Sequence, residues 1–296
     1  KHLVCGAYTM GTGTVWFDDF AVQELAGSGG PPSAEVLALS REFNALVRKS
    51  AIYRDSIDWK VVEEDLAELG RGLKTADDAQ VLHSYVLGQL RKAGDNHSFL
   101  QNKVAAQNYA SATSVQGKPE ARLLEGGVGY ISVPGFGSVN RELTESFASG
   151  IQKLIGELDQ GNDIKGWVVD LRGNTGGNMY PMISGLGPLL DLGTLGYFVS
   201  EGRYNPWKLG SKGMGVTIAK PYRLKNARQP IAVLIGPRTS SSGEMTAVSF
   251  LGQANARTFG QPSGGFVTAN QTFALSDGSN LLLATSYVAD RNKKAY

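Results

Sequence analysis

The residues best suited to chemistry form a run of hydroxyl side chains between an apolar stretch and a stretch with helical spacing. The apolar stretch, 231–235, is rich in β-branched residues and ends in Gly-Pro, which is typical of a buried strand entering a turn. Three serines follow at 240–242. A helix that starts there offers free amide groups and the positive end of its dipole to an oxyanion. Taken alone, the pattern favours an ordinary helix cap.

Two further loops carry polar side chains at the ends of predicted elements. Residues 95–98 (Asp-Asn-His-Ser) follow a predicted helix, where a histidine is more often simply exposed. Residues 170–177 (Asp-Leu-Arg-Gly-Asn-Thr-Gly-Gly) follow a buried strand, and their glycines let backbone N–H groups turn toward one point. This loop lacks the glycine order and the Lys-Ser/Thr ending of nucleotide-binding loops. Because parallel strands gather such loops at one edge, we expect 170–177 and the serines to converge.

The composition bounds the class of protein. With 296 residues, 42% hydrophobic and 19% charged, the chain resembles a globular protein with ample sequence for a core. A net charge of +2 gives no argument for nucleic acid or an anionic membrane as partner. No apolar run approaches the ~20 residues of a membrane span. The sequence has one cysteine, Cys5, so no internal disulfide is possible. One cysteine and three histidines in the whole sequence argue against a structural zinc site. No metal or cofactor is expected.

The two ends of the sequence predict a longer protein. Residues 1–25 are predicted as strands, and 15–20 (Val-Trp-Phe-Asp-Asp-Phe) resemble the closing strands of jelly-roll β-sandwich domains. A glycine- and proline-rich linker follows at 26–32. The sequence begins at Lys1 without a charged and apolar leader, and stops at Tyr296 after a charged turn. We therefore expect both ends to be cuts in a longer chain.

Helical spacing dominates the part that follows the linker. Apolar residues recur at three- and four-residue intervals over 33–49, 59–69 and 75–93. Ser56 is the expected cap of the second helix, and Thr75 with Asp78 forms a capping-box-like start to the third. Residues 101–126 are polar and predict a loop with one weak strand.

From residue 127 onward, strands and helices alternate. Helices are expected at 141–158 and 180–190 and from 241. Strand patterns occur at 129–134, 166–171, 196–200, 216–219, 231–235, 257–260, 271–275 and 281–288. The last two are joined by Ser-Asp-Gly, a hairpin signal. Strand, crossover helix and strand repeated in this way predict an α/β core.

Four motifs together resemble a known family. They are Gly-Tyr-Ile at 129–131, Asp-Leu-Arg-Gly-Asn-Thr-Gly-Gly at 170–177, Ser-Ser-Ser-Gly-Glu at 240–244 and Gly-Gln-Pro-Ser-Gly-Gly at 260–265. In this order and spacing they are similar to the serine peptidases of the carboxyl-terminal processing (tail-specific) protease and tricorn family. The resemblance covers about 33–296. It implies a crotonase-like α/β catalytic core at 127–296, with a helical N-terminal part at 33–126.

The resemblance also implies a catalytic site. The family's nucleophile stands three residues before a glutamate, which corresponds to Ser241. Its oxyanion hole uses the amide after the nucleophile, here Ser242, and a glycine amide of the Asp-Leu-Arg loop, here Gly176 or Gly177. The implied chemistry is attack of a serine hydroxyl on a peptide carbonyl, without a cofactor.

The sequence departs from the processing proteases at their catalytic lysine. That residue lies about 25 positions after the serine, which here is Phe266, so a Ser–Lys dyad is excluded. Tricorn-like members use a histidine after the helical region instead, and His97 corresponds to it. Their orienting glutamate lies near the end of the domain, so a third catalytic residue is expected in a part of the chain that follows the C-terminal tyrosine. Candidates for supporting roles are Glu244, Asn96 and Asp170.

The resemblance leaves two functions open. The first is a serine peptidase of protein or peptide substrates, in which His97 acts as base. The second is a peptidase-like binding or scaffold module without turnover, which the missing lysine favours. Only about 30 residues separate His97 from Gly127, too few for the PDZ module of the family. By resemblance alone we expect an exported protein, in the periplasm or at the cell surface. Oligomeric state and cleavage preference are left open.

Overall fold

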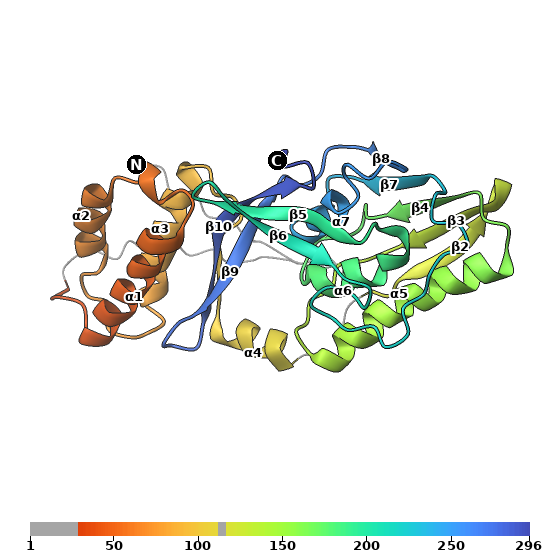
Figure 1. Cartoon of the computed structure of the whole chain (residues 1–296). Coiled ribbons are helices and arrows are strands. Elements are labelled where there is room, and N and C mark those ends of the chain that lie inside the picture. Colours follow the sequence, from red (N-terminus) through yellow and green to blue (C-terminus); the bar gives the residue numbers. More distant parts are fainter. Residues whose placement is uncertain (1–28, 112–116) are drawn as a thin grey trace.

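Residues 29–111 and 117–296 are described by a computed structural model, and they form two five-stranded sheets with helices packed on them (Figure 1). The β-sandwich strands expected within 1–25 lie outside the described residues, as does the first part of the linker 26–32. Within the described part, the mixed α/β architecture expected from the alternating pattern is confirmed.

The first sheet carries the expected parallel core. Its strands β3, β4, β7 and β8 run parallel, and β2 adds to the edge in the antiparallel direction. In spatial order the strands are β2 (Glu120–Leu124), β3 (Val128–Ser132), β4 (Gly166–Asp170), β7 (Ile231–Ile235) and β8 (Ala256–Gly260). The associated helices are α5 (Arg141–Gly161), α6 (Met179–Gly185) and α7 (Ser242–Val248).

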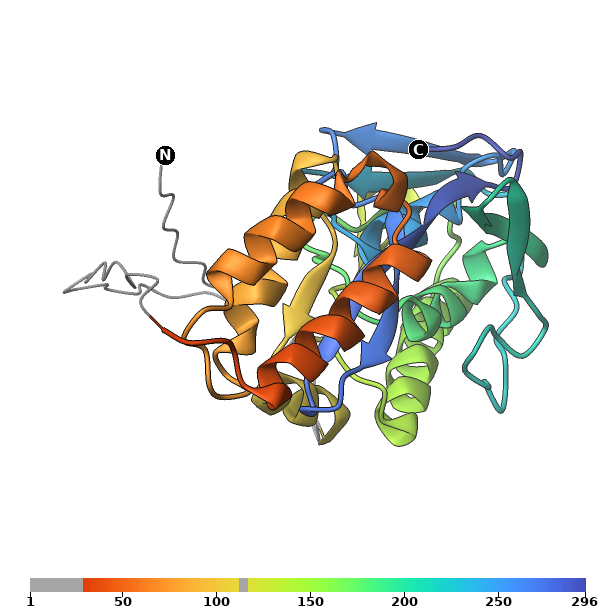
Figure 2. The ribbon, with the colours of Figure 1, turned by 90° about the vertical axis from the view of Figure 1, so that its left-hand side faces the viewer.

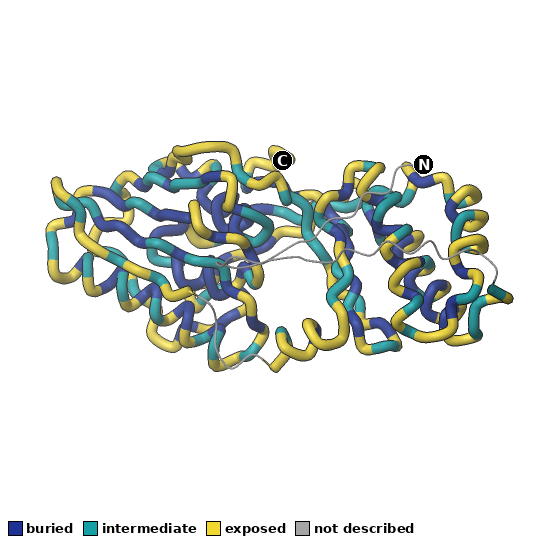
Figure 3. Tube along the Cα trace, turned by 180° about the vertical axis from the view of Figure 1, so that it is seen from behind, coloured by how far each residue is buried: buried dark blue, intermediate teal, exposed yellow. Residues whose placement is uncertain are grey.

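Burial explains why these segments form these elements. Helix α5 has its apolar residues at helical spacing, and Phe147, Ile151 and Ile155 are buried along one side. On one face of strand β4, Trp167 and Val169 are each at most 1% exposed, and on the other face Asp170 is buried and Val168 half-buried. Figure 3 shows the buried residues concentrated between this sheet and its helices. The carboxyl ends of β4 and β7 therefore emerge side by side, as expected of parallel neighbours.

The second sheet is antiparallel and is built around its longest strand. Strand β10 pairs with three others. The strands are β1 (Phe99–Gln101), β5 (Gly193–Ser200), β6 (Arg203–Leu209), β9 (Thr268–Ala274) and β10 (Asn280–Asp290). Strands β9 and β10 form the hairpin that the sequence predicts.

Three helices lie on one side of the second sheet, the first and third against the sheet and the second packed on the third (Figure 2). They are α1 (Ala34–Ser50), α2 (Trp59–Leu69) and α3 (Ala79–Lys92), and Phe43 of α1 and Leu90 of α3 pack with Leu281 of β10. Short 3₁₀ turns lie at Arg54–Ser56, Glu125–Gly127 and Gly187–Leu189. The helical N-terminal part thus shares its hydrophobic core with strands from the end of the chain.

Some boundaries differ from the expectation. Helix α2 is capped by Asp58 rather than Ser56, because the Asp58 carboxylate accepts from the amides of the first turn. Helix α3 begins at Ala79 rather than at Thr75, since the Asp78 carboxylate ties the residues before it into a turn.

Three further elements were predicted wrongly. The segment 101–126 holds helix α4 (Lys103–Ser111) besides β2, and Asn102 caps its start. Strand β6 was not expected, although Trp207 and Leu209 alternate with exposed residues. The segment 216–219 is not a strand, because its alternating apolar residues pack as a loop against Ala148 of α5.

No helix within the described residues is long and apolar enough to cross a membrane. Across 29–111 and 117–296 there is also no cluster of three or more histidine, cysteine or acidic side chains that could hold a metal ion.

A close approach in the parallel sheet gives a test of its packing. Gly129 of β3 lies opposite Trp167, and a Cβ at this position would stand 2.6 Å from the indole ring. We expect Gly129→Ala to lower the free energy of unfolding by about 1–3 kcal/mol, because the buried ring has no room to move. Urea denaturation measures the change.

The matched control is Gly150→Ala in the middle of α5. A Cβ there meets nothing within 4 Å, so the substitution should stabilise the helix by about 0.5–1 kcal/mol. Equal effects of the two alanines would contradict the packing described for the sheet.

Candidate active site

Ser241 lies on a sharp turn between β7 and α7. Its φ of 53° and ψ of −121° place a non-glycine residue in a sparsely populated backbone region. The residue before helix α7 therefore presents its side chain at the carboxyl edge of the sheet. A strained serine between a strand and a helix is also how the nucleophile is exposed in α/β-hydrolases.

Glu244 holds this turn in place. Its side chain is 3% exposed, and Oε2 accepts a hydrogen bond of 2.7 Å from the Ser241 amide. The other oxygen, Oε1, accepts from the Ser263 hydroxyl at 2.6 Å and from the Gly265 amide at 2.8 Å. One buried carboxylate thus ties the serine turn to the loop that leads into β9.

His97 meets Ser241 although the two residues are 144 positions apart. Its Nε2 lies 2.9 Å from the Ser241 Oγ. The turn that carries His97 is fixed by Asp95, whose Oδ1 accepts from the His97 and Ser98 amides at 2.9 Å each. The side-chain amide of Asn270 in β9 donates to the His97 carbonyl at 2.8 Å. The histidine is therefore held from its own turn and from the second sheet.

The far side of the imidazole faces a hydroxyl. The His97 Nδ1 lies 2.9 Å from Oγ1 of Thr268, the first residue of β9. The Phe266 ring, which occupies the register of the family's lysine, lies tilted beside the imidazole with 5.4 Å between ring centroids. Thr268 was not among the expected site residues. Its only signal was its place in the Gly-Gly-Phe-Val-Thr run aligned with the lysine motif.

The environment lowers the pKa of His97 below its ordinary value of 6.5. Burial is the largest cause, because it disfavours the charged imidazolium. A hydrogen bond with the Thr268 backbone and the charge on Asp95 act in the opposite direction but do not outweigh burial. The imidazole is consequently neutral at pH 7, with one nitrogen able to accept a proton.

The amides expected to form the oxyanion hole differ in their bonding. The Gly176 amide already donates to the Asn174 side chain at 3.0 Å. Within 29–111 and 117–296, no hydrogen-bond acceptor meets the amides of Gly177 and Ser242. Gly176 packs closely on the serine turn, since an added Cβ would stand 3.2 Å from the Ser242 nitrogen. The two loops converge, and their free amides are those of Gly177 and Ser242.

Hydrogen bonds also fix the direction of the Gly177 amide. It belongs to the same planar peptide unit as the Gly176 carbonyl, which accepts from the Phe136 amide at 3.0 Å. The Gly177 carbonyl accepts from the Ser242 hydroxyl at 2.5 Å. The peptide plane between Gly176 and Gly177 is therefore held through its carbonyl. The plane that follows Gly177 is held on both sides, because the Asn178 amide also donates to the Phe136 carbonyl at 2.7 Å.

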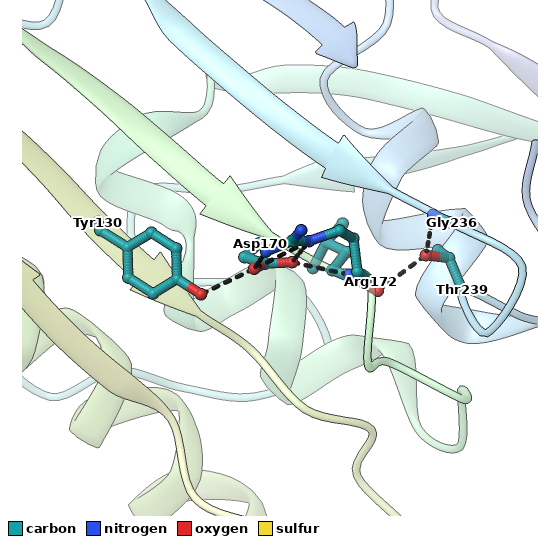
Figure 4. Close-up of polar contacts among 6 residues, drawn as sticks. Tyr130, Asp170, Arg172, Gly236 and Thr239 are labelled. Carbon is teal, nitrogen blue, oxygen red and sulfur yellow. Dashed lines mark hydrogen bonds and ion pairs between the residues drawn. The ribbon is translucent and has the colours of Figure 1, made fainter. Parts of the chain in front are cut away.

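Asp170 braces the strand ends (Figure 4). Its carboxylate accepts from the Tyr130 hydroxyl at 2.7 Å and from the Arg172 side chain at 2.6 Å. Burial alone would raise the pKa of Asp170, but the bonds from Arg172 and Tyr130 outweigh it and hold that pKa below its usual value. Beside it, Thr239 Oγ1 donates to the Leu171 carbonyl at 2.8 Å and so joins the two loops.

Two expected supporting residues thus lie outside the serine–histidine contact. The hydrogen bonds of Asp170 go to its neighbours and not to Ser241 or His97. Asn96 is exposed, and its side chain makes no hydrogen bond within the described ranges. Of the three supporting candidates, Glu244 is the one bonded to the serine turn.

A match to one family accompanies this geometry. The sequence model of peptidase family S41 matches residues 127–295, and the chain belongs to that family. Among curated proteins, the Nisin-resistance protein of Lactococcus lactis subsp. lactis is 31% identical over 252 residues, which is 83% of this chain and 75% of that protein. Carboxyl-terminal-processing peptidase 2 of Arabidopsis thaliana, a chloroplastic protein, is 27% identical over 161 residues, or 54% of this chain and 28% of that protein.

Solved structures agree with this assignment. A lipoprotein from Streptococcus agalactiae superimposes with a TM-score of 0.74 and 29% identity, and the match covers 90% of this chain and 89% of the other. The photosystem II D1 C-terminal processing protease has a TM-score of 0.58 at 15% identity, covering 89% and 90% of the two chains. The second likeness concerns the fold alone. The resemblance derived from the four motifs is confirmed.

The lowered pKa of His97 can be measured directly. We expect its ring signals in a nuclear magnetic resonance titration to change with a midpoint below pH 6.5, because burial penalises the imidazolium. The neutral form should therefore persist into mildly acidic solution. A His97→Gln variant assigns the signals, and a midpoint above 6.5 would contradict the buried environment of the ring.

Proposed function

We propose that the protein is a serine peptidase that hydrolyses peptide bonds, with Ser241 as nucleophile and His97 as general base. The observation that carries this proposal is the 2.9 Å contact between His97 Nε2 and Ser241 Oγ. A distance in this range is what direct proton transfer between a base and a nucleophile requires. Membership of peptidase family S41 supports the same reaction class.

The proposed reaction passes through an acyl-enzyme. As Ser241 Oγ bonds to the carbonyl carbon of the substrate, its proton moves to His97 Nε2. The imidazolium then gives that proton to the leaving amine as the C–N bond breaks. In the second half, His97 takes a proton from water and the resulting hydroxide attacks the ester carbon. The bond from that carbon to Ser241 Oγ then breaks, the carboxylic acid leaves, and the proton returns to Ser241 Oγ. The neutral state of His97 at pH 7 fits its first task.

The negative charge on the carbonyl oxygen is assigned to two amides. The Ser242 amide starts helix α7, and the Gly177 amide is oriented by its peptide plane. Gly176 is excluded from this role because Asn174 occupies its amide. An oxyanion donor of this kind contributes typically ~10²–10³-fold in rate.

Thr268 and Glu244 are assigned positioning roles. The Thr268 hydroxyl is the polar atom at the Nδ1 of His97, where a triad has a carboxylate. When it accepts from Nδ1–H, the lone pair of Nε2 faces Ser241. Glu244 fixes the strained turn by accepting from the Ser241 amide.

The substrate and the place of action follow from the relatives. A peptidase family implies a protein or peptide substrate. The relatives described as a lipoprotein and as a nisin-resistance protein support action at the cell surface or outside the cell, and they do not favour the periplasm over the surface.

A serine-directed fluorophosphonate probe tests the assignment of nucleophile and base. We expect the wild type to be labelled, Ser241→Ala to remain unlabelled, and His97→Ala to react about 10²–10⁴-fold more slowly, because the base is lost. Gel fluorescence against time gives the rates. Ser240→Ala is the matched control, since its hydroxyl bonds only weakly to the Arg238 carbonyl at 3.4 Å.

The same measurement decides between the two functions left open by the sequence. A folded wild type that the probe labels no faster than Ser241→Ala would favour the non-catalytic binding module. Full reactivity of His97→Ala would remove His97 from the reaction while leaving the nucleophile assigned.

The role of Thr268 is tested by removing its hydroxyl without changing its shape. We expect Thr268→Val to lower the labelling rate roughly 3–10-fold, the equivalent of one hydrogen bond. Thr268→Ser, which keeps a hydroxyl at this position, should restore the rate. A valine variant with an unchanged labelling rate would show that Thr268 only packs there.

A further inference from the structure

Strand β9 has one free edge within the described part of the chain. It pairs with β10 over Thr268–Ala274, and no other described strand lies on its far side. Figure 1 shows the two strands running together as a hairpin beside the helical part. The strand is not covered, since none of its residues is classed as buried. A free strand edge of this kind is a template for pairing with another chain.

The register identifies the backbone groups on that edge. The Leu275 amide donates to the Ser279 carbonyl, so this opposed pair bonds across the hairpin. Alternation along the strand then turns Ala274, Thr272 and Asn270 away from β10. The bonds of Ala284, which lies opposite Asn270, support this orientation. The Ala284 amide donates to the Ser98 hydroxyl and its carbonyl accepts from the Ile52 amide, so neither group bonds to Asn270.

Each of the three outward residues offers one N–H and one C=O group. Within 29–111 and 117–296, no partner meets the backbone groups of Asn270, Thr272 and Ala274. Their spacing of two residues is that of a strand ready to accept a neighbour.

This edge continues directly from the proposed catalytic residues. Thr268, the first residue of β9, faces the His97 imidazole, and the Asn270 side chain bonds to the His97 carbonyl. Thr272 is four residues beyond Thr268, which is about 13 Å along a strand. A chain lying on the edge could therefore start at the serine–histidine contact.

A groove runs beside the same edge. It has a volume of about 510 Å³ and lies between α1 and β9. It is lined by apolar and charged residues of α1 and by three consecutive residues of β9, namely Glu42, Ala45, Leu46, Lys49 and Thr272–Ala274. Room for substrate side chains thus adjoins the backbone groups.

We propose that the free edge of β9 binds the polypeptide substrate as an added strand, and this inference rests on the function proposed above. The occupant is an extended chain on one side of its scissile bond. Its backbone pairs with Asn270, Thr272 and Ala274, and side chains enter the groove beside α1. Main-chain pairing makes recognition tolerant of sequence but dependent on length, with about four residues needed to reach Thr272.

Proline at Thr272 tests this pairing. Thr272→Pro removes an outward N–H and leaves the ladder to β10 intact, because Gln271 and Phe273 form those bonds. The matched control is Thr258→Pro on β8, the edge of the other sheet. The Asn255 carbonyl accepts from the Ile231 amide, and the Gln261 amide donates to the Ile235 carbonyl, so the odd-numbered residues of β8 bond to β7. The Thr258 amide therefore points away from β7, as the Thr272 amide points away from β10.

Two readouts are taken on each variant, namely hydrolysis of unfolded, carboxymethylated casein and labelling by the small fluorophosphonate. We expect Thr272→Pro to lower kcat/KM for casein at least about 10-fold with labelling within about twofold of wild type, and Thr258→Pro to change neither. Normal casein hydrolysis by a folded Thr272→Pro would overturn the edge proposal. Lack of labelling in the wild type would instead overturn the proposed function.

A second measurement needs no variant. Peptides spanning a casein cleavage site are shortened stepwise on either side of the scissile bond. We expect kcat/KM to fall sharply when fewer than about four residues remain on one side, and N-methylation of alternate amides on that side to have the same effect. Rates independent of length and of N-methylation would overturn the proposal. So would a labelled wild type that leaves casein uncut, because backbone pairing tolerates any sequence.

Discussion

The contact between His97 and Ser241 lies where the two sheets meet, and the sheets also share a hydrophobic core. The serine belongs to the parallel core, whereas the histidine follows the helices that pack on the antiparallel sheet. A distance of 2.9 Å between Nε2 and Oγ is kept only if both sheets hold a fixed position. The segment 263–268 provides that connection, since Glu244 binds its beginning and Thr268 at its end faces the imidazole. This short piece of chain therefore links the serine turn directly to the histidine.

The parallel core was accessible from the sequence because local and tertiary preferences agree there. An apolar run, a turn and helical spacing were enough to predict the strand 231–235 and the helix after Ser241. The 170–177 loop lies beside them, as expected when two parallel strands are neighbours. Where the preferences disagree, the sequence misled. The alternating segment 216–219 packs as a loop against α5. Strand β6 was missed because its first four residues are exposed and its buried residues lie at one end.

The site shows the same division between local and long-range information. Ser241 and Ser242 stand in one motif and the glycine pair in another, so their proposed roles could be expected from resemblance. Thr268 was not expected, because its place near the family's lysine position gives it no role until the fold brings His97 beside it. The choice between Gly176 and Gly177 likewise needed the side chain of Asn174, which occupies one of the two amides.

The fixed peptide plane at Gly176 and Gly177 has a consequence for control of the proposed activity. Rotating this plane to remove the Gly177 N–H from the site would break the bond from the Phe136 amide to the Gly176 carbonyl. Under the proposed mechanism, that bond opposes a dormant form created by rotating the amide. We then expect restraint of the proposed proteolysis to come from which chains can reach the serine and how long they stay extended beside it.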